Sequence, residues 1–227
     1  VSQTDTNVKK TDKFEIRIHI NEKNKTITIQ DNGIGMDEND MQANLGTIAK
    51  SGTEDFIKKL GDKKGDINQI GKFGVGFYSS FMVSDQVVVR SKKYDSSSSY
   101  LWTSDGKGTF SIEPTEFNIL GTEITLSIKK DEEEFLSKYR IEEIVKKYSD
   151  FVPFPIFVSS EEDKKEKKDK EEKEEQVNSA EAIWLKDKTK IKEDEYKSFF
   201  NQTSTYYDEP LQTIHFKAEG VVNYTAL

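Results

Sequence analysis

The 227-residue sequence has no cysteine, which excludes both a disulfide scaffold and a thiolate metal site. It has no run of about 18 apolar residues, the length that a membrane-spanning helix needs. Its longest apolar patch, residues 151–158, is broken by Pro153 and Pro155. Basic residues are in deficit, and a net charge of −8 opposes binding to the phosphate backbone of nucleic acid. These absences predict a protein with no membrane-spanning segment and no nucleic-acid partner.

The sequence also lacks an initiating methionine and a signal-peptide pattern, and residues 224–227 end in a strand-like run. We therefore expect a segment of a longer protein. Hydrophobic and charged residues each make up 33% of the chain. This balance is typical of a globular core with a heavily charged surface or an inserted charged segment.

Hydrophobic periodicity predicts the main elements. Apolar and polar residues alternate from Phe14 to Ile20 and again through Ile27 and Ile29, so a hairpin is predicted over this stretch. Asp37 can cap a following helix. The apolar stripe of that helix is Met41, Leu45 and Ile48. Further strands are predicted over residues 86–91, 99–103, 109–113 and 122–129, and a helix over residues 132–149.

Residues 161–175 are fifteen consecutive charged residues, nine acidic and six basic. Such a run buries too little apolar surface to offset the entropy of ordering it, which predicts a disordered linker over residues 161–176. A solvated single helix is the alternative interpretation. The linker divides the chain into a first domain over residues 1–160 and the truncated beginning of a second over residues 177–227.

Residues 31–36 read Asp-Asn-Gly-Ile-Gly-Met and directly follow a predicted strand. The two glycines let the backbone approach a flat ligand while the carboxylate of Asp31 accepts a hydrogen bond from it. Asp-Asn-Gly is also a common tight turn, so these residues alone leave both interpretations open.

Residues 71–79 read Gly-Lys-Phe-Gly-Val-Gly-Phe-Tyr-Ser. Glycines in this order allow positive φ angles and expose backbone N–H groups that can surround phosphate oxygens. The order is the reverse of the dinucleotide-binding G-x-G-x-x-G pattern, and the Gly-Lys-Ser/Thr ending of a Walker loop is missing. A plain flexible loop is the alternative.

Asn44 lies on the same face of the predicted helix as the apolar stripe. A buried amide without a partner costs about 1–3 kcal/mol, so this side chain needs a hydrogen-bonding group. It either caps a neighbouring loop or faces a ligand.

In combination, these motifs resemble the nucleotide site of the heat-shock protein 90 family of molecular chaperones. That family belongs to the superfamily of gyrase, histidine-kinase and MutL-type ATPases. The resemblance is carried by residues 31–36, 44–52, 70–79 and 121–122, and continues through residues 147–149, 155–156, the charged linker, 193–196, 214–216 and 219–220. It implies an α/β two-layer sandwich with a mostly antiparallel twisted sheet and helices on one face. Residues 177–227 would then open the family's middle domain.

The resemblance also implies roles for individual residues in binding ATP or ADP. Asp31 would accept a hydrogen bond from the exocyclic amine of adenine, with Gly35 and Thr122 in a water-bridged network around it. The walls of the base and ribose site would be Met36, Leu45 and Phe77. Asn44 would reach the ribose or the α-phosphate. Backbone N–H donors to the phosphates would be Gly74, Val75 and Gly76, with Lys50 nearby. Residues 46–70 would form a mobile lid over bound ATP.

The family places its general base, a Glu, and a Mg²⁺-ligating Asn on a helix before the first strand seen here, in a Glu-Leu-Ile-Ser-Asn-Ala-type motif. Residues 1–13 contain no such motif. No catalytic residue and no metal ligand is therefore assigned in this chain, because both are expected upstream of Val1. ATP hydrolysis with Mg²⁺ is expected of the complete protein and not of this chain alone.

The resemblance further implies client proteins and co-chaperones as partners. It implies a homodimer formed through a C-terminal domain that this segment lacks, so the segment itself is expected to be a monomer. The location stays open between the cytoplasm and an organelle (mitochondrion, plastid or endoplasmic reticulum), because no targeting segment is visible in the sequence.

Two alternatives remain: another ATPase of the superfamily, such as a topoisomerase subunit or a histidine kinase, or a non-catalytic nucleotide-binding regulatory module. A kinase would need a phospho-acceptor histidine on a helix, whereas His19 and His215 lie in strand-like runs.

Overall fold

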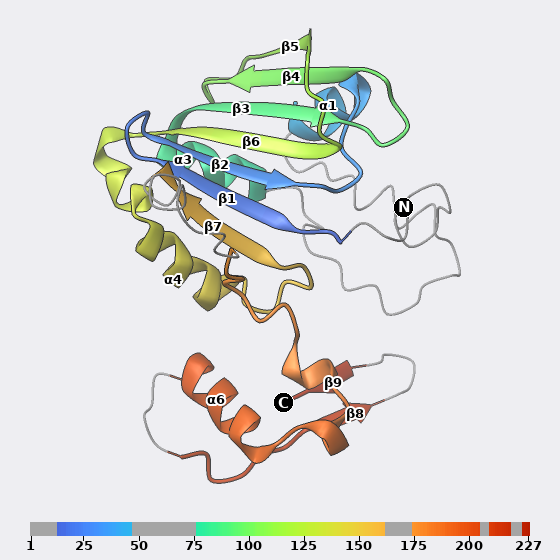
Figure 1. The fold of residues 1–227 in the computed structure, drawn as a ribbon, viewed down its shortest axis with the longest axis vertical. Helices are drawn as coiled ribbons and strands as arrows, with labels where there is room; N and C mark the ends of the chain where they lie inside the picture. Colours follow the sequence, from blue (N-terminus) through green and yellow to red (C-terminus); the bar gives the residue numbers. More distant parts are fainter. Residues whose placement is uncertain (1–12, 47–75, 162–173, 205–208, 219–223) are drawn as a thin grey trace.

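The computed structural model describes residues 13–46, 76–161, 174–204, 209–218 and 224–227. Its main feature is a seven-stranded sheet that is followed by a small second unit (Figure 1). The strands of the large sheet are β1 (Ile16–Asn21), β2 (Thr26–Asp31), β3 (Ser84–Lys92), β4 (Ser99–Ser104), β5 (Phe110–Thr115), β6 (Gly121–Ile128) and β7 (Ile156–Ser160). The second sheet pairs β8 (Phe216–Ala218) with β9 (Tyr224–Ala226).

The described α-helices are α1 (Glu38–Leu45), α3 (Ser80–Val83), α4 (Lys138–Tyr148) and α6 (Glu193–Thr203). The short 3₁₀ helices are η1 (Gly76–Ser79), η2 (Lys130–Leu136), η4 (Ile183–Leu185) and η5 (Lys188–Lys190). None of the described helices has the length and apolar character needed to cross a membrane.

The strand order in the large sheet is β5-β4-β3-β6-β2-β1-β7. All neighbouring pairs are antiparallel except β1 and β7, which run parallel. The prediction of a mostly antiparallel sheet is confirmed. The predicted hairpin is β1 with β2, where Ile18 faces Ile29 and Ile20 faces Ile27. The four further predicted strands correspond to β3, β4, β5 and β6.

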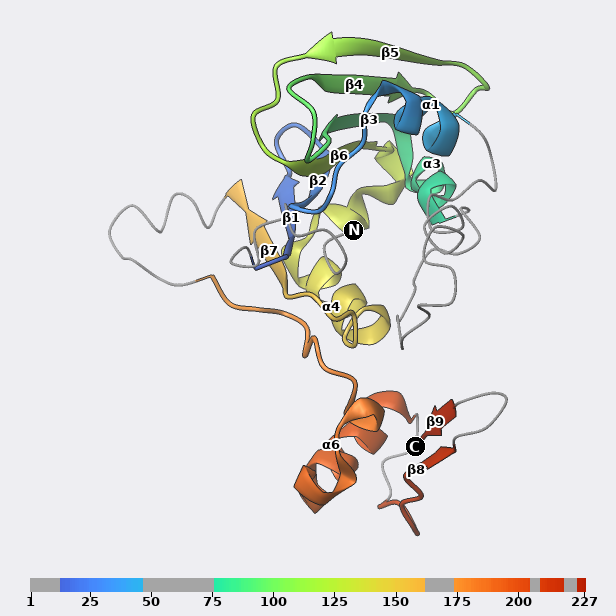
Figure 2. The ribbon, with the colours of Figure 1, turned by 90° about the vertical axis from the view of Figure 1, so that its right-hand side faces the viewer.

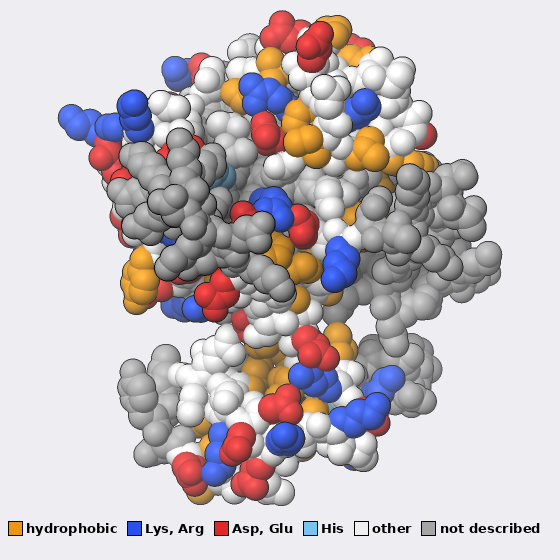
Figure 3. All heavy atoms as spheres, in the orientation of Figure 1, with side chains coloured by type: hydrophobic (Ala, Val, Ile, Leu, Met, Phe, Trp, Pro, Cys, Tyr) orange, Lys and Arg blue, Asp and Glu red, His pale blue; other side chains and the backbone are white. Residues whose placement is uncertain are grey.

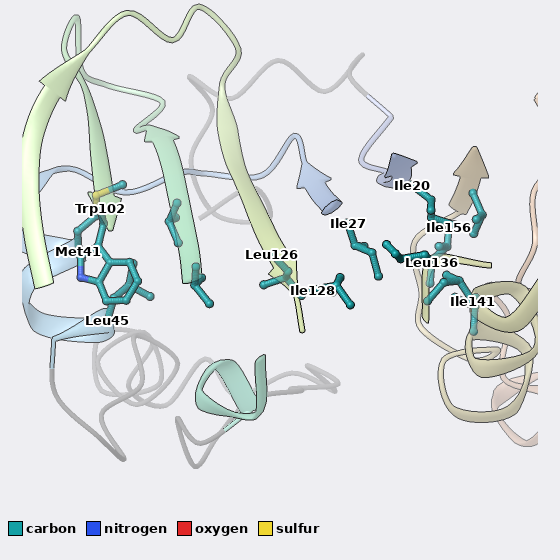
Figure 4. Close-up of a cluster of buried hydrophobic side chains, with 14 residues drawn as sticks. Ile20, Ile27, Met41, Leu45, Trp102, Leu126, Ile128, Leu136, Ile141 and Ile156 are labelled. Atoms are coloured by element: carbon teal, nitrogen blue, oxygen red, sulfur yellow. The ribbon is translucent and has the colours of Figure 1, made fainter. Parts of the chain in front are cut away.

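Helices α1, α3 and α4 lie on the same side of the sheet (Figure 2), which confirms the two-layer arrangement. The core fills the space between the layers because one face of each strand is apolar. Trp102, Met41 and Leu45 form one end of this core, and Ile20 with Ile141 lie at the other end (Figure 4). A side chain on this face of the sheet therefore points toward the helices.

The opposite face of the sheet is polar. Arg90 on β3 pairs with Glu123 on β6 at 2.9 Å, and Arg17 on β1 pairs with Glu15 at 2.6 Å. Figure 3 shows acidic and basic side chains close together on this side of the molecule. The alternation along each strand therefore separates a core face from a charged face.

The helix predicted over residues 132–149 is divided in two. Ser137 has extended backbone angles (φ −82°, ψ 123°) and separates η2 from α4. Its hydroxyl accepts a hydrogen bond from the backbone N–H of Arg140, so it caps α4. Glu132 inside η2 also has non-helical backbone angles (φ −115°, ψ 18°), so residues 130–136 do not form a continuous α-helix with α4.

The described elements that were not predicted include α3, β7 and α6. β7 was not predicted because Pro153 and Pro155 lie just before it, and proline usually interrupts a strand. Here both prolines precede β7, and the carbonyl of Pro155 accepts a hydrogen bond from the N–H of Ile16. β7 then pairs with β1 although about 140 residues separate the two strands in the chain.

The chain returns to the first domain after the charged segment. Asn178 is only 4% exposed; its Oδ1 accepts from the N–H of Ile156, and its Nδ2 donates to the carbonyls of Val152 and Phe154. Ordered contacts therefore cross residue 177, where the domain boundary was predicted. The division into domains stays a prediction. Most of the predicted linker, residues 162–173, lies outside the described residues.

Candidate functional site

Asp31 is the last residue of β2 and lies opposite Thr122 on β6, which in turn lies opposite Ser91 on β3. The three residues form a polar row across three neighbouring strands. They share the alternation of the core residues Ile29, Ile124 and Val89, so the row is on the side of the sheet that carries the helices.

The carboxylate of Asp31 accepts a hydrogen bond of 2.8 Å from the N–H of Gly33, and the backbone N–H of Thr122 also donates to it. Burial raises the pKa of Asp31 above its usual value, and the two backbone donors oppose this rise. A carboxylate offers about four acceptor positions. Asp31 can therefore accept further hydrogen bonds from a ligand.

Two glycines allow neighbouring backbone segments to come close together at the ends of β2 and β3. Gly121 has φ +114°, and a Cβ there would lie 2.2 Å from the carbonyl oxygen of Asp31. Gly35 has φ +65°, and its Cβ would lie 2.0 Å from the carbonyl oxygen of Lys92. Neither position can hold a larger residue without moving the backbone. The Asp-Asn-Gly-Ile-Gly-Met segment is therefore held against the end of β3.

Ser91 connects the elements of the site and was not predicted from the sequence. Its hydroxyl is completely buried and lies 2.8 Å from the backbone N of Met36, 2.8 Å from the carbonyl oxygen of Gly121 and 3.0 Å from Oγ1 of Thr122. A signal was present in the sequence, because Ser91 continues the inward alternation of Val87 and Val89 with a polar residue.

Helix α1 begins as predicted at Asp37, which forms a capping box with Asp40. Met41 and Leu45 are buried, and Asn44 is half-buried between them on the helix. The predicted placement of Asn44 beside the apolar stripe is therefore observed, while Ile48 lies outside the described residues. Whether Asn44 reaches a ribose or a phosphate stays a prediction.

Lys93 joins the end of β3 to the start of α1. Its Nζ lies 2.6 Å from Oδ2 of Asp37 and 2.8 Å from Oδ2 of Asp40. The two carboxylates raise the pKa of Lys93 well above its usual value, and the ammonium group lowers the pKa of Asp37. This pair of contacts was also not predicted from the sequence.

Phe77 lies in η1 and packs edge-on against the ring of Trp102, with 5.4 Å between ring centroids. The neighbouring hydroxyl of Tyr78 donates to the carbonyl of Leu45 at 3.0 Å. Met36 and Phe77 are both partly buried against the core that includes Leu45. The three predicted wall residues therefore all join one apolar cluster, and their contact with a base stays a prediction.

The predicted phosphate site is described only at its edge. Gly76 begins η1, whereas Lys50, Gly74 and Val75 lie outside the described residues. Of the predicted lid, residues 46–70, only Gly46 is described. Within the described part of the chain, no group of three or more His, Asp or Glu side chains is arranged to hold a metal ion.

A separate cavity of about 300 Å³ lies between the turn before β7 and helix α6. Phe151, Ile183 and Phe199 supply its apolar lining, and Glu181 and Asp194 are among its acidic residues. None of the predicted nucleotide-site residues lines this cavity, so it is distinct from the polar row on the sheet.

Comparison with known protein families finds a matching family model for each of the two parts of the chain. Residues 6–146 match the family model described as histidine kinase-, DNA gyrase B-, and HSP90-like ATPase, which confirms the predicted fold class. Residues 134–181 and 158–227 match the Hsp90 protein family model.

Several relatives are chaperone proteins HtpG. The one from Wolinella succinogenes is 49% identical over 213 residues, covering 93% of this chain and 34% of the relative. The one from Helicobacter pylori strain 26695 is 48% identical, covering 93% of this chain and 35% of the relative. The one from Aliarcobacter butzleri is 47% identical, covering 99% of this chain and 38% of the relative. The chain thus spans about a third of the length of these relatives. It belongs to the heat-shock protein 90 family, with the ATPase-type N-terminal domain followed by the start of the middle region.

Proposed function

We propose that this chain is the nucleotide-binding part of an ATP-dependent molecular chaperone. ATP or ADP binds on the helix side of the sheet, with its adenine against Asp31. In the complete protein, hydrolysis is coupled to closure of residues 46–70 and to binding of unfolded client proteins. The observation that carries this proposal is the half-buried carboxylate of Asp31, which keeps free acceptor capacity at strand ends where glycines bring the backbone close.

The described residues fit an adenine group. Asp31 accepts from the exocyclic amine; Thr122 lies opposite it in the sheet, and Gly35 lies against the end of β3. Met36, Leu45 and Phe77 exclude water from the base because they join the apolar core. An apolar surround strengthens the hydrogen bond to the carboxylate, since no solvent competes for it.

Mg²⁺ would bind mainly through the nucleotide phosphates and an Asn that we place upstream of Val1. The residues that we assign to the site include one carboxylate, that of Asp31, which we assign to the base, and the described residues contain no group of three or more acidic or histidine side chains arranged to hold a metal ion. When bound, Mg²⁺ neutralises charge on the phosphates during transfer. This chain's own residues bind and orient the nucleotide, and no residue in it is assigned as the base that activates water.

Client proteins, co-chaperones and dimerisation belong to the complete protein. The relatives named chaperone protein HtpG support this proposal, because nearly the whole chain aligns with them. We propose that the segment alone is a monomer, and that dimerisation uses the C-terminal domain of the full-length protein.

The decisive experiment measures ADP binding and ATP hydrolysis on the same 227-residue sample. Calorimetry should detect ADP binding, and steady-state phosphate release should stay at background. A second sample with an upstream helix carrying the family Glu and Asn should show slow turnover, because general-base catalysis supplies about 10²–10⁴-fold. If neither of the two samples bound ADP, the proposed nucleotide site would be rejected. If the 227-residue chain hydrolysed ATP, and an inhibitor of this chaperone family blocked that hydrolysis, the general base would have to lie within residues 1–227.

A further inference from the structure

We propose that Asn32 is a site of spontaneous chemical modification, that the folded chain slows this modification, and that conversion of Asn32 to isoaspartate disables the neighbouring nucleotide site. The modification and its control by the fold stand on the contacts of Asn32 and Gly33. The effect on the nucleotide site rests on the proposed binding of ADP or ATP at Asp31.

Asn32 and Gly33 form the only Asn-Gly pair in the sequence. In such a pair the backbone nitrogen of the glycine loses its proton to hydroxide and attacks Cγ of the asparagine. The new N–C bond closes a five-membered succinimide ring, and the side-chain nitrogen leaves as ammonia. Water then opens the ring at one of its two carbonyls and leaves aspartate or isoaspartate. Glycine favours the attack because it has no Cβ beside the reacting nitrogen.

The folded chain fixes the side chain that this reaction attacks. Oδ1 of Asn32 accepts a hydrogen bond of 2.8 Å from the backbone N–H of Glu15, and Nδ2 donates to the carbonyl of Lys13 at 2.9 Å. The last pair in the register of β1 and β2 is Ile16 with Asp31 (Figure 1). The side-chain amide of Asn32 therefore continues the pairing of these strands and is held by the chain just before β1.

The folded chain also occupies the nucleophile. The backbone N–H of Gly33 donates to Oδ1 of Asp31 at 2.8 Å. Loss of this proton would leave an amide anion facing a carboxylate, and the repulsion between two like charges opposes it. Succinimide formation therefore requires that Asn32 leaves the chain before β1 and that Gly33 leaves Asp31.

Isoaspartate does not fit the backbone at this position. A Cβ on Gly121 would lie 2.8 Å from Cα of Asn32 and 2.2 Å from the carbonyl oxygen of Asp31, so the two segments are already in close contact. Isoaspartate runs the main chain through the side-chain carboxyl group and lengthens it by a methylene group. The longer chain displaces the carboxylate of Asp31 from the N–H of Gly33, and with it the group that we assign to adenine.

The rate of conversion depends on how often these contacts open. A reaction that proceeds only from an open form runs at the rate of the unfolded chain multiplied by the fraction of time spent open. We expect conversion of the folded chain to be at least about tenfold slower than conversion of the same chain in urea, because more than one hydrogen bond has to open.

The test measures conversion at Asn32 by mass spectrometry of digested samples kept in mildly alkaline buffer, with and without urea. Glu15→Pro removes the N–H that holds Oδ1 of Asn32. Glu15→Ala is the matched control, because it keeps this N–H and loses the same side-chain contact with Arg17. The ratio of the rate in urea to the rate in buffer should fall by about threefold or more in Glu15→Pro and should keep the wild-type value in Glu15→Ala.

Asp31→Ala tests the second contact, and it replaces the first test if Glu15→Pro does not fold. It removes the acceptor of the Gly33 N–H, so the same ratio should fall. The rate in urea corrects each variant for any change in the intrinsic reactivity of its Asn-Gly pair.

The effect on the nucleotide site is measured on wild-type chain that has been aged in the same buffer. Calorimetry gives the number of ADP-binding sites, and the digest gives the fraction of isoaspartate at position 32. The number of binding sites should fall in step with the isoaspartate fraction. Chain aged with saturating ADP should convert more slowly, because the bound nucleotide stabilises the closed form.

The outcomes separate the two proposals. Freshly prepared wild-type chain that does not bind ADP would overturn the proposed function, while the conversion rates would still test the modification site. Equal rates in buffer and in urea, or equal ratios in Glu15→Pro and Glu15→Ala, would overturn the control by the fold. Isoaspartate-containing chain that binds ADP as tightly as fresh chain would overturn the effect on the nucleotide site.

Discussion

The ammonium group of Lys93 lies 2.6 Å from the carboxylate of Asp37 and so ties the end of β3 to the first turn of α1. Asp37 simultaneously caps the helix through the N–H of Asp40. The helix that carries Asn44 and Leu45 is therefore positioned against the sheet by a charged contact as well as by its buried side chains.

Replacing Lys93 with Met should lower the free energy of unfolding by about 1 kcal/mol, because the contact is partly exposed and screened. It should also weaken ADP binding by about two- to fivefold, since α1 is less firmly placed. Lys186→Met is the matched control: Lys186 also bridges two carboxylates, Glu181 at 3.0 Å and Glu195 at 3.2 Å, but lies beyond residue 177. It should leave ADP affinity unchanged. Urea unfolding and calorimetry measure both effects, and equal losses of affinity in the two variants would contradict the prediction.

The stability that the Lys93 contact provides should depend on pH. The pKa of Asp37 is lowered in the folded state, so its contribution is present above the unfolded value of about 3.9 and is lost as pH falls through the folded value. The pKa of Lys93 is raised, so its contribution is complete below about 10.4 and is lost as pH rises through the folded value. The difference in unfolding free energy between wild type and Lys93→Met should be constant from about pH 5 to 10 and should shrink toward about pH 3. A difference that grows on acidification would argue against the ion pair.

Asp31→Asn should weaken ADP binding by about tenfold or more, because losing a charge-assisted hydrogen bond costs on the order of 1.5–3 kcal/mol. The amide oxygen of Asn can still accept from Gly33, so the turn should persist and circular dichroism should be unchanged. Asp85→Asn, at an exposed position at the start of β3, serves as the control. An unchanged dissociation constant in a folded Asp31→Asn chain would remove Asp31 from the adenine site.

Gly121→Ala should destabilise the chain by about 2–4 kcal/mol, because the new Cβ meets the Asp31 carbonyl at a positive φ. Gly108→Ala separates the cost of the positive φ from the cost of the steric clash, because Gly108 has φ +97° but a Cβ there would meet no atom within 4 Å. Gly108→Ala should cost only the conformational strain of about 1 kcal/mol. Urea unfolding of both variants checks the comparison, and equal costs would show that the close approach of β2 and β6 is unimportant.

Asn178→Ala should destabilise the chain by about 2–3 kcal/mol, because it leaves the N–H of Ile156 and the carbonyls of Val152 and Phe154 without their partner. Asn118→Ala, at an exposed position, should change stability by less than about 0.5 kcal/mol. Thermal unfolding measures both. If Asn178→Ala were equally mild, the return of the chain to the first domain would contribute little to stability.

The sequence predicted the local elements well, and the reason is periodicity. The alternation at Ile16, Ile18 and Ile20 indicates which face of the strand is buried, whichever strand it pairs with. The cap at Asp37 is equally local, because it acts within the first turn of the helix. Ser137 shows the limit of this approach: the apolar spacing continued past it, but its extended backbone divides the helix.

The amino-acid sequence by itself determined strands β1 to β6, the start of α1 and the glycine positions of the candidate site, because each depends on neighbours a few residues away. Only the tertiary structure decided that β7 pairs with β1, that Lys93 reaches Asp37, and that Ser91 lies between Met36 and Thr122. These contacts join residues that are 31 or more positions apart in the chain, and their partners are chosen by which strands meet in the folded sheet. A buried serine on an apolar strand face acquires its hydrogen-bonding direction from those partners, which local periodicity does not specify.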